Sequence, residues 1–235
     1  MSHAEVVTRS AVASRRPPSS CNASCRHATR CEATRGGDPA LLDMREVVER
    51  VGPFSGGDRL VQPDAPHRAA FAVLSGMAKT VGDGRVLAFH LPGELFALDV
   101  ARGEAHHASI VAMGKTWFCR FPRIATDALC VHNEALTKHL RALRRRERVG
   151  PTRVFDGPAV VRMRAFLADL LQRRRHIEGP GSFVPLPMSR DDIGSYLAMS
   201  PATVTRMLAQ LRTLGVIDIR PGGIDVLDEA ALLRG

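Results

Sequence analysis

Three of the five cysteines in this chain of 235 residues lie close together near its start, in the stretch SSCNASCRHATRCEA, residues 19–33. Cysteine thiols form disulfides, and as thiolates they bind soft metals. The first twenty residues lack the apolar run of a secretion signal, so we do not expect a disulfide framework. The grouping of Cys21, Cys25 and Cys31 therefore predicts a metal site, and the identity of the metal is open.

The charge of the chain indicates a polyanionic partner. Its 33 Lys and Arg residues exceed its 24 Asp and Glu residues, which leaves a formal net charge of +9. Such a surplus attracts nucleic acid. A genome rich in G and C is the alternative source of the surplus, because it encodes arginine often and lysine rarely. Lysine occurs only at Lys79, Lys115 and Lys138.

Two other classes of protein are not expected. No apolar run reaches the roughly 18 residues that a membrane-spanning helix needs. The sequence also contains no nucleophile elbow, P-loop or HExxH motif, so we do not expect an enzyme.

The apolar patterns predict the elements that must position these groups. Residues 1–20 indicate a disordered basic arm, and apolar residues at helical spacing predict a short helix from Leu41 to Val51. From Pro53 to Pro122, short apolar runs broken by Gly and Pro predict the strands of a compact antiparallel barrel or roll. Leucines three to four residues apart then predict a helix, and Gly150-Pro151 should end it at a domain boundary.

The C-terminal part of the chain predicts two capped helices followed by a hairpin. Ser189 with Asp192 fits a capping box, and Ser200 followed by Pro201 is a favourable start for the second helix. Isoleucines alternate on both sides of Pro221-Gly222-Gly223, which is typical of the wing of a winged helix-turn-helix. The apolar residues of the second helix recur at i, i+3, i+4 and i+7, as Val204, Met207, Leu208 and Leu211.

The opposite face of this second helix suits the major groove of DNA. It presents small or hydrogen-bonding residues around one arginine, namely Ala202, Thr205, Arg206 and Ala209. Arginine is the commonest specific reader of guanine. We expect Arg206 and Thr205 to contact bases, and Ser200 and Thr203 to contact the DNA backbone or base edges. The alternative is a helical hairpin inside another kind of domain.

The order of strands, long helix and winged helix-turn-helix resembles the CRP/FNR family of bacterial transcription regulators. The resemblance is carried by AFHLPGELFALDV, SIVAMGKTWFCRFPR and DDIGSYLAMSPATVTRMLAQLRTLGVI. It implies an α+β fold with an N-terminal cyclic-nucleotide-binding-like β-roll (a jelly roll), a linking dimerisation helix and the winged helix-turn-helix. The implied boundaries are 1–20 for the arm, 21–39 for the cysteine-rich segment, 40–125 for the sensory β-roll, 126–149 for the dimerisation helix, and 150–235 for the DNA-binding domain.

The cysteines resemble those of the oxygen-sensing FNR-like branch. Cys21, Cys25 and Cys31 match its N-terminal ligands, and Cys119 falls at the distant fourth position of a 4Fe–4S cluster. We expect Arg26, His27 and Arg30 to lower the thiol pKa values. The alternatives are a structural zinc, a thiol redox switch or, in a different class, an iron–sulfur electron carrier, for which the chain lacks the ferredoxin spacing.

The resemblance also implies partners. It predicts a homodimer in the bacterial cytoplasm, bound to double-stranded DNA at a two-fold symmetric operator, with RNA polymerase as a partner if the protein activates. Oxygen, nitric oxide and redox poise are the candidate signals. Cyclic nucleotide is not expected: Gly93-Glu94 is present, but His106 and His107, interpreted as exposed loop residues, stand where the cAMP-binding members have an Arg-Ser pair.

The sequence departs from the family pattern at three points. The cysteine spacing is C-x3-C-x5-C, where the best-known members have two residues between the first pair. Gly150-Pro151 should shorten the dimerisation helix or weaken the dimer. Ala202 replaces a glutamate of the typical recognition helix, so we expect a changed base preference.

Overall fold

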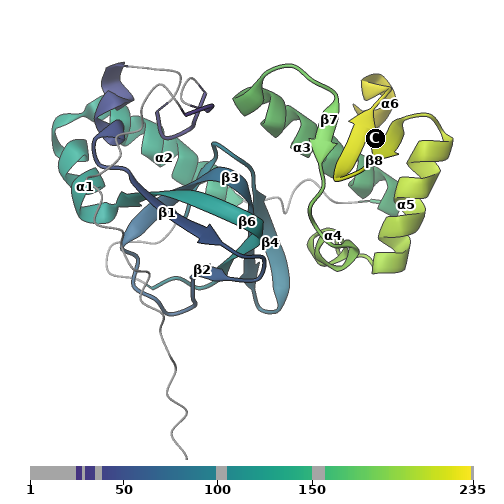
Figure 1. Ribbon diagram of the computed structural model, residues 1–235, viewed down its shortest axis with the longest axis horizontal. Coiled ribbons are helices and arrows are strands. Elements are labelled where there is room, and N and C mark those ends of the chain that lie inside the picture. Colours follow the sequence, from purple (N-terminus) through teal and green to yellow (C-terminus); the bar gives the residue numbers. More distant parts are fainter. Residues whose placement is uncertain (1–24, 28–29, 35–38, 99–104, 150–156, 234–235) are drawn as a thin grey trace, which may run out of the picture.

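The computed structural model describes residues 25–27, 30–34, 39–98, 105–149 and 157–233, so the predicted arm at 1–20 lies outside the described residues. A strand-rich half comes first along the chain and a mainly helical half follows it (Figure 1). The elements in chain order are η2 (Pro39–Arg45), β1 (Glu49–Phe54), β2 (Arg59–Val61), β3 (Ala69–Gly82), β4 (Arg85–His90), β5 (Leu95–Phe96), β6 (Ser109–Pro122), α1 (Arg123–His132), α2 (Glu134–Val149), α3 (Ala159–Glu178), β7 (Phe183–Pro185), α4 (Arg190–Leu197), α5 (Pro201–Thr213), β8 (Ile217–Arg220), β9 (Gly223–Val226) and α6 (Glu229–Leu233).

The roll is built around two long antiparallel strands. β3 and β6 have 14 residues each and pair from Ala69 opposite Pro122 to Val81 opposite Ser109. β1 joins the free edge of β6 and β4 joins the free edge of β3, which gives the order β1-β6-β3-β4. Apolar side chains fill the interior, among them Val73, Ala78, Phe96, Ile110 and Phe118. The predicted β-roll is therefore present.

The predicted helix from Leu41 to Val51 is wrong over its second half. The 3-10 helix η2 ends at Arg45, and β1 begins at Glu49. Val51 pairs with Phe118 of β6. The sheet edge thus recruits a segment whose apolar spacing alone is compatible with a helix.

Two helices stand where the sequence predicts one. α1 and α2 are separated by Asn133, which has an extended backbone. Its side-chain oxygen accepts a hydrogen bond from the N–H of Leu136 at 2.9 Å and so starts α2. α2 ends at Val149, directly before Gly150, and its buried leucines are Leu136, Leu140 and Leu143.

The C-terminal half has its own small sheet. β7, β9 and β8 pair in that order, and β8 and β9 form the predicted hairpin, with Ile217 opposite Val226 and Ile219 opposite Ile224. α3, α4 and α5 pack beside this sheet. In the described part of the chain, no helix is long and apolar enough to cross a lipid bilayer.

The two halves share one buried core. The ring of Phe89 on β4 lies 5.0 Å from that of Tyr196 on α4 and 6.0 Å from that of Phe166 on α3, measured between centroids. Lys79 of β3 contacts the carboxylate of Asp192 at 2.5 Å. The first helix of the predicted helix-turn-helix therefore rests on the roll.

Candidate functional site

Three of the four cysteines predicted as ligands lie at one corner of the roll. Cys119 lies on β6, and its side chain packs against a buried cluster that contains Cys31. Cys31 is 8% exposed and Cys25 is half-buried. The thiols of Cys31 and Cys25 both act electrostatically on that of Cys119. Cys21 lies outside the described residues, and its role stays a prediction.

Burial dominates the protonation of two of these thiols. It raises the pKa of Cys31 to about 11 and the pKa of Cys119 to about 12. The expectation that Arg26, His27 and Arg30 lower the thiol pKa is therefore wrong for these two cysteines, because desolvation disfavours the charged thiolate. A bound metal would favour loss of these protons, because it stabilises the thiolates.

The donor chemistry of this corner fits either of the groups considered from the sequence. Thiolates are the ligands of iron–sulfur clusters and also of tetrahedral zinc. Among the described residues, no three His, Cys, Asp or Glu side chains are grouped so that they could hold a metal ion. The fit is therefore one of donor type, supplied by thiols from the cysteine-rich stretch and from a strand of the roll.

The cysteine segment, defined here as residues 25–27 and 30–34, is held to the roll through its backbone. The carbonyl of His27 accepts hydrogen bonds from the N–H groups of Arg30 and Cys31, at 3.0 and 2.7 Å. The N–H of Glu32 then donates to the carbonyl of Gly93 at 2.9 Å. A tight turn thus places Cys31 beside the loop that follows β4.

The helix-turn-helix has the predicted caps. The Ser189 hydroxyl accepts a hydrogen bond from the N–H of Asp192 at 3.0 Å, and the Ser200 hydroxyl accepts one from the N–H of Thr203 at 3.1 Å. The turn after α4 packs closely against Gly194 within that helix, because a Cβ on Gly194 would lie 2.5 Å from the carbonyl oxygen of Met199.

The predicted outer face of α5 is exposed and its predicted inner face is buried. Thr205 and Arg206 are exposed, whereas Val204 and Leu208 are buried. The Thr205 hydroxyl donates to the carbonyl of Pro201 at 3.1 Å, which leaves its lone pairs available to a ligand. The Ser200 and Thr203 hydroxyls lie 2.9 Å apart within the cap. The DNA contacts of these residues stay predictions.

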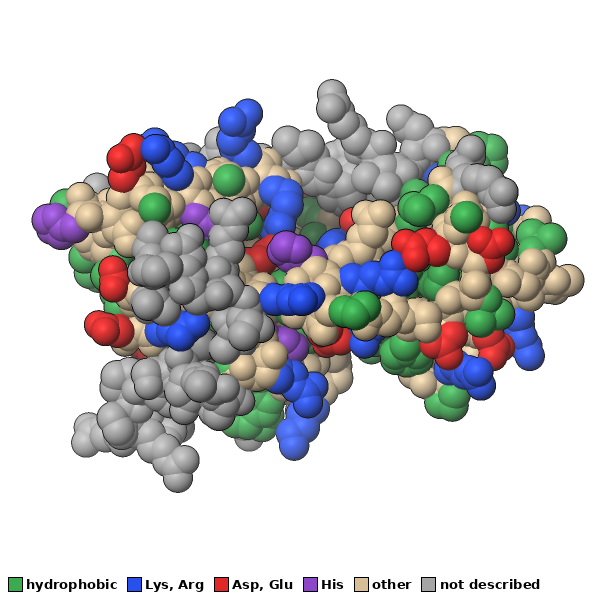
Figure 2. All heavy atoms as spheres, turned by 90° about the horizontal axis from the view of Figure 1, so that it is seen from above, with side chains coloured by type: hydrophobic (Ala, Val, Ile, Leu, Met, Phe, Trp, Pro, Cys, Tyr) green, Lys and Arg blue, Asp and Glu red, His purple; other side chains and the backbone are tan. Residues whose placement is uncertain are grey.

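Positive charge is spread over the molecule. Figure 2 shows Lys and Arg side chains scattered over the described part of the face seen from above, interspersed with Asp and Glu side chains. On α2, Arg141 and Arg145 are exposed. Such a distribution favours polyanions without defining a sequence-specific surface.

Both halves of the chain match known protein families. Residues 52–133 match the cyclic nucleotide-binding domain, and residues 161–234 match the Crp-like helix-turn-helix domain. The chain is 30% identical over 198 residues to the transcriptional activator protein anr of Pseudomonas aeruginosa, a match that covers 80% of this chain and 81% of that protein. The chain belongs to the CRP/FNR family of transcription regulators.

Other members of the CRP/FNR family agree with this assignment. The fumarate and nitrate reduction regulatory protein of Vibrio cholerae is 27% identical over 204 residues, which cover 83% of this chain and 81% of that protein. The structure of FixK2 from Bradyrhizobium japonicum superposes with a TM-score of 0.69 at 24% identity, over 79% of this chain and 96% of that one. The predicted family and the predicted α+β fold are both confirmed, and the helix-turn-helix is a DNA-binding domain.

The Gly-Glu position of the CRP/FNR roll is engaged by the chain itself. The guanidinium of Arg173 on α3 donates to both carboxylate oxygens of Glu94, from Nε at 2.8 Å and from Nη2 at 2.7 Å. Burial by itself raises the pKa of Glu94, but Arg173 outweighs burial and holds the pKa of the carboxyl below its usual value. The buried Glu94 and the half-buried Arg173 therefore form a charged pair between the roll and the DNA-binding domain.

The interpretation of both neighbouring histidines as exposed loop residues is wrong for one of them. His106 is 6% exposed, and its ring lies 5.1 Å from that of His67. Burial lowers the pKa of His106 to about 4, so the ring is neutral at neutral pH. His107 is exposed.

Sequence reasoning missed the charged residues that join the cysteine segment to α2 and the roll to α3. Glu32 and Arg146 are 114 positions apart in sequence, and Glu94 and Arg173 are 79 apart. The available signal was that Glu32 follows Cys31 directly and that Glu94 belongs to the Gly-Glu pair. No periodicity in the sequence names their partners.

Proposed function

We propose that this chain is a cytoplasmic, sequence-specific transcription regulator that binds a two-fold symmetric operator as a homodimer. We further propose that a 4Fe–4S cluster on Cys21, Cys25, Cys31 and Cys119 governs that binding. The observation that carries the proposal is the meeting of Cys119 with Cys25 and Cys31 at one corner of the roll, across about ninety residues of sequence. The V. cholerae relative, by its name, regulates fumarate and nitrate reduction.

The chain supplies the ligands from two separately held parts. Cys119 lies on β6, which pairs with β3 over residues 109–113 and 117–122, with Cys119 opposite Ala72. Cys25 and Cys31 lie on the cysteine segment, which is attached by a few hydrogen bonds. A bound 4Fe–4S cluster would supply a redox-active centre that oxygen can attack. Loss of the thiolate ligation would free the cysteine segment from β6.

On the DNA side, the exposed face of α5 supports direct base reading. We assign base contacts to Arg206 and Thr205, and contacts with the backbone or base edges to Ser200 and Thr203. Arg206 is exposed in the second turn of α5, on the N-terminal half that recognition helices insert into the major groove.

The internal contacts of the roll support an effector other than a cyclic nucleotide. Arg173 binds Glu94, and the Glu32 carboxylate accepts the N–H of Leu95 at 2.8 Å. A nucleotide at this loop would have to displace both contacts. His106 and His107 offer no bidentate donor for a phosphate.

One experiment tests the cluster. The protein is purified without air, and its iron, acid-labile sulfide, zinc and visible spectrum are measured. Cys119→Ser should lose iron as completely as Cys25→Ser. Cys130→Ser is the matched control, because Cys130 packs against the same buried cluster and should keep iron. Iron retained by Cys119→Ser contradicts the ligand set.

The same measurement decides between the alternatives. A colourless protein with one zinc per chain supports the structural zinc site, and a metal-free protein whose DNA binding follows thiol oxidation supports the redox switch. Both results would leave the DNA-binding function in place.

A further inference from the structure

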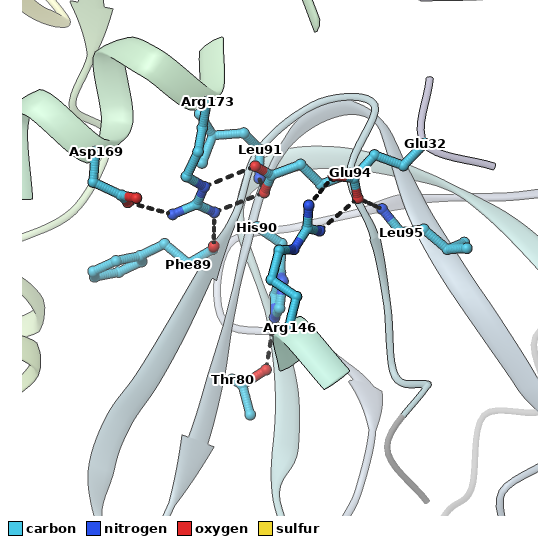
Figure 3. Close-up of polar contacts among 10 residues, drawn as sticks. All are labelled: Glu32, Thr80, Phe89, His90, Leu91, Glu94, Leu95, Arg146, Asp169 and Arg173. Atoms are coloured by element: carbon cyan, nitrogen blue, oxygen red, sulfur yellow. Dashed lines mark hydrogen bonds and ion pairs between the residues drawn. The ribbon is translucent and has the colours of Figure 1, made fainter. Parts of the chain in front are cut away.

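Glu32, the residue after Cys31, joins the cysteine segment to α2. Its side chain is 6% exposed. The guanidinium of Arg146 on α2 donates to both carboxylate oxygens, from Nη1 at 2.5 Å and from Nη2 at 2.8 Å (Figure 3). The backbone carbonyl of Glu32 lies 2.5 Å from Nε2 of His139, also on α2. A buried carboxylate of this kind is stable only while its partners stay in place.

The same carboxylate also holds the loop after β4. The N–H of Leu95 donates to Glu32 at 2.8 Å, and the carbonyl of Gly93 accepts the Glu32 N–H at 2.9 Å. We call residues 91–95 the central loop. It is therefore fixed on one side by the cysteine segment.

On its other side the central loop holds α3. Between Gly93 and Leu95 lies Glu94, which accepts two hydrogen bonds from Arg173 (Figure 3). Arg173 also donates to the carbonyl of Phe89 at 2.6 Å and to Asp169 at 2.9 Å. The fit is close, because a Cβ on Gly93 would lie 2.5 Å from Cγ2 of Ile177. α3 is the first helix of the DNA-binding domain.

The cysteine segment also reaches α3 directly. Nη1 of Arg30 donates to the carbonyl of Arg175 at 3.3 Å, near the C-terminal end of the helix. One continuous set of contacts thus joins the cysteine segment to α2, to the central loop and to α3. Within it, Glu32 is the buried charged residue that directly follows the predicted ligand Cys31.

From this arrangement we infer that Glu32 is a positioning residue that couples the order of the cysteine segment to the placement of the DNA-binding domain within one subunit. When Cys31 is held, Glu32 fixes the central loop, and the central loop holds α3 through Glu94 and Arg173. When the segment is released, the Leu95 N–H loses its buried partner and α3 loses part of its support. The inference rests on the proposed sensory role of the segment, and it adds a route to the operator that does not pass through the dimer interface.

Hydrogen exchange on the full chain tests the coupling. Glu32→Gln keeps the shape of the side chain and removes its charge. In protein purified without air, which retains any bound metal, amides of the central loop and of the C-terminal turns of α3 should exchange about ten-fold faster in Glu32→Gln than in the unmodified protein. Amides at the centre of α5, such as that of Leu208, should change less than two-fold. Glu46→Gln, which removes an exposed carboxylate, should leave all of these rates unchanged.

A second variant breaks the same contact from the other side. Arg146→Gln should reproduce the pattern, whereas Arg145→Gln, on the exposed face of the same helix, should not. Because both changes remove one interaction, the double variant Glu32→Gln/Arg146→Gln should exchange no faster than the more affected single variant. If Glu32→Gln does not fold, Arg146→Gln and its control Arg145→Gln are sufficient for the test.

Two results overturn the inference. In the first, faster exchange is confined to the cysteine segment and α2, with α3 unchanged. In the second, all protected amides speed up equally, which indicates a general loss of stability. Metal analysis of Glu32→Gln keeps this test separate from that of the proposed function, because every thiol is retained. An unmodified protein without iron would contradict the cluster and leave the exchange comparison valid.

Discussion

Arg173 of α3 and Glu94 of the roll form an ion pair with two hydrogen bonds, at 2.8 and 2.7 Å, between the DNA-binding domain and the roll. The Glu94 side chain is 7% exposed and that of Arg173 is 27% exposed. The pair stands at the Gly-Glu position that first suggested a nucleotide-binding roll. The pair therefore links the roll directly to the DNA-binding domain.

Removal of one partner should destabilise the protein strongly. Arg173→Gln leaves the Glu94 carboxylate buried without its cation, and we expect a loss of about 3 kcal/mol in the free energy of unfolding. Urea denaturation followed by circular dichroism measures the loss. The double variant Glu94→Gln/Arg173→Gln should lose less than the sum of the single variants. Additive losses would contradict a direct pair.

The stability of the protein should fall in mild acid because of His90. Burial lowers the pKa of His90 to about 4, and its Nε2 lies 2.7 Å from the Thr80 hydroxyl. The charge of Glu94 raises the pKa of the ring, and the charges of Arg173 and Arg146 lower it, by smaller effects than burial. The unfolded chain binds the proton near pH 6.5, so the neutral ring contributes fully to stability above that pH. The contribution is lost as the pH falls toward 4, by up to about 1.4 kcal/mol per pH unit.

The measurement compares urea unfolding at pH 7, 6 and 5. The free energy of unfolding of His90→Gln should depend less steeply on pH than that of the unmodified protein. The difference in slope should correspond to about one proton fewer bound on unfolding. His106, whose pKa burial also lowers to about 4, should contribute a second proton that this variant keeps. An identical pH dependence in both proteins would show that His90 is accessible to protons in the folded state.

Loss of the cap on α5 should reduce stability without altering the fold. Ser200→Ala removes the acceptor of the Thr203 N–H, so we expect a loss of about 1 kcal/mol. Ser200→Asn supplies another capping oxygen and should recover most of it. Thermal unfolding of the two variants checks this. If Ser200→Asn regains stability but not operator affinity, the Ser200 hydroxyl also contacts DNA.

Arg206→Ala should abolish discrimination at one base pair of each operator half-site. A bidentate arginine contact with guanine contributes about 1–3 kcal/mol of discrimination, which corresponds to a ten-fold or larger change in the affinity ratio. Arg212→Ala removes the same charge from the exposed end of the same helix. It should weaken binding to all sequences and reduce its salt dependence. Equal weakening on every sequence by Arg206→Ala would contradict base reading.

Local patterns were sufficient for the C-terminal part of the fold. The caps at Ser189 and Ser200, the inward residues of α5 and the hairpin of β8 and β9 all follow from interactions between residues close in sequence. The same kind of reasoning failed between Leu41 and Val51, because pairing of β1 with distant β6 overrode a helical spacing. It also predicted one helix where α1 and α2 are separate. The leucine spacing does not reveal that Asn133 interrupts the helix and caps α2.

The sequence by itself determined which chemistry is available: thiols at Cys21, Cys25, Cys31 and Cys119, an arginine at the outer face of a capped helix, and a surplus of positive charge. Only the tertiary structure decided which of these groups meet and in what environment. Burial raised the thiol pKa values that nearby arginines were expected to lower, because desolvation depends on packing rather than on sequence neighbours. The pairing of Glu32 with Arg146 and of Glu94 with Arg173 likewise depends on how the roll, α2 and α3 pack together, and local spacing carries no record of such contacts.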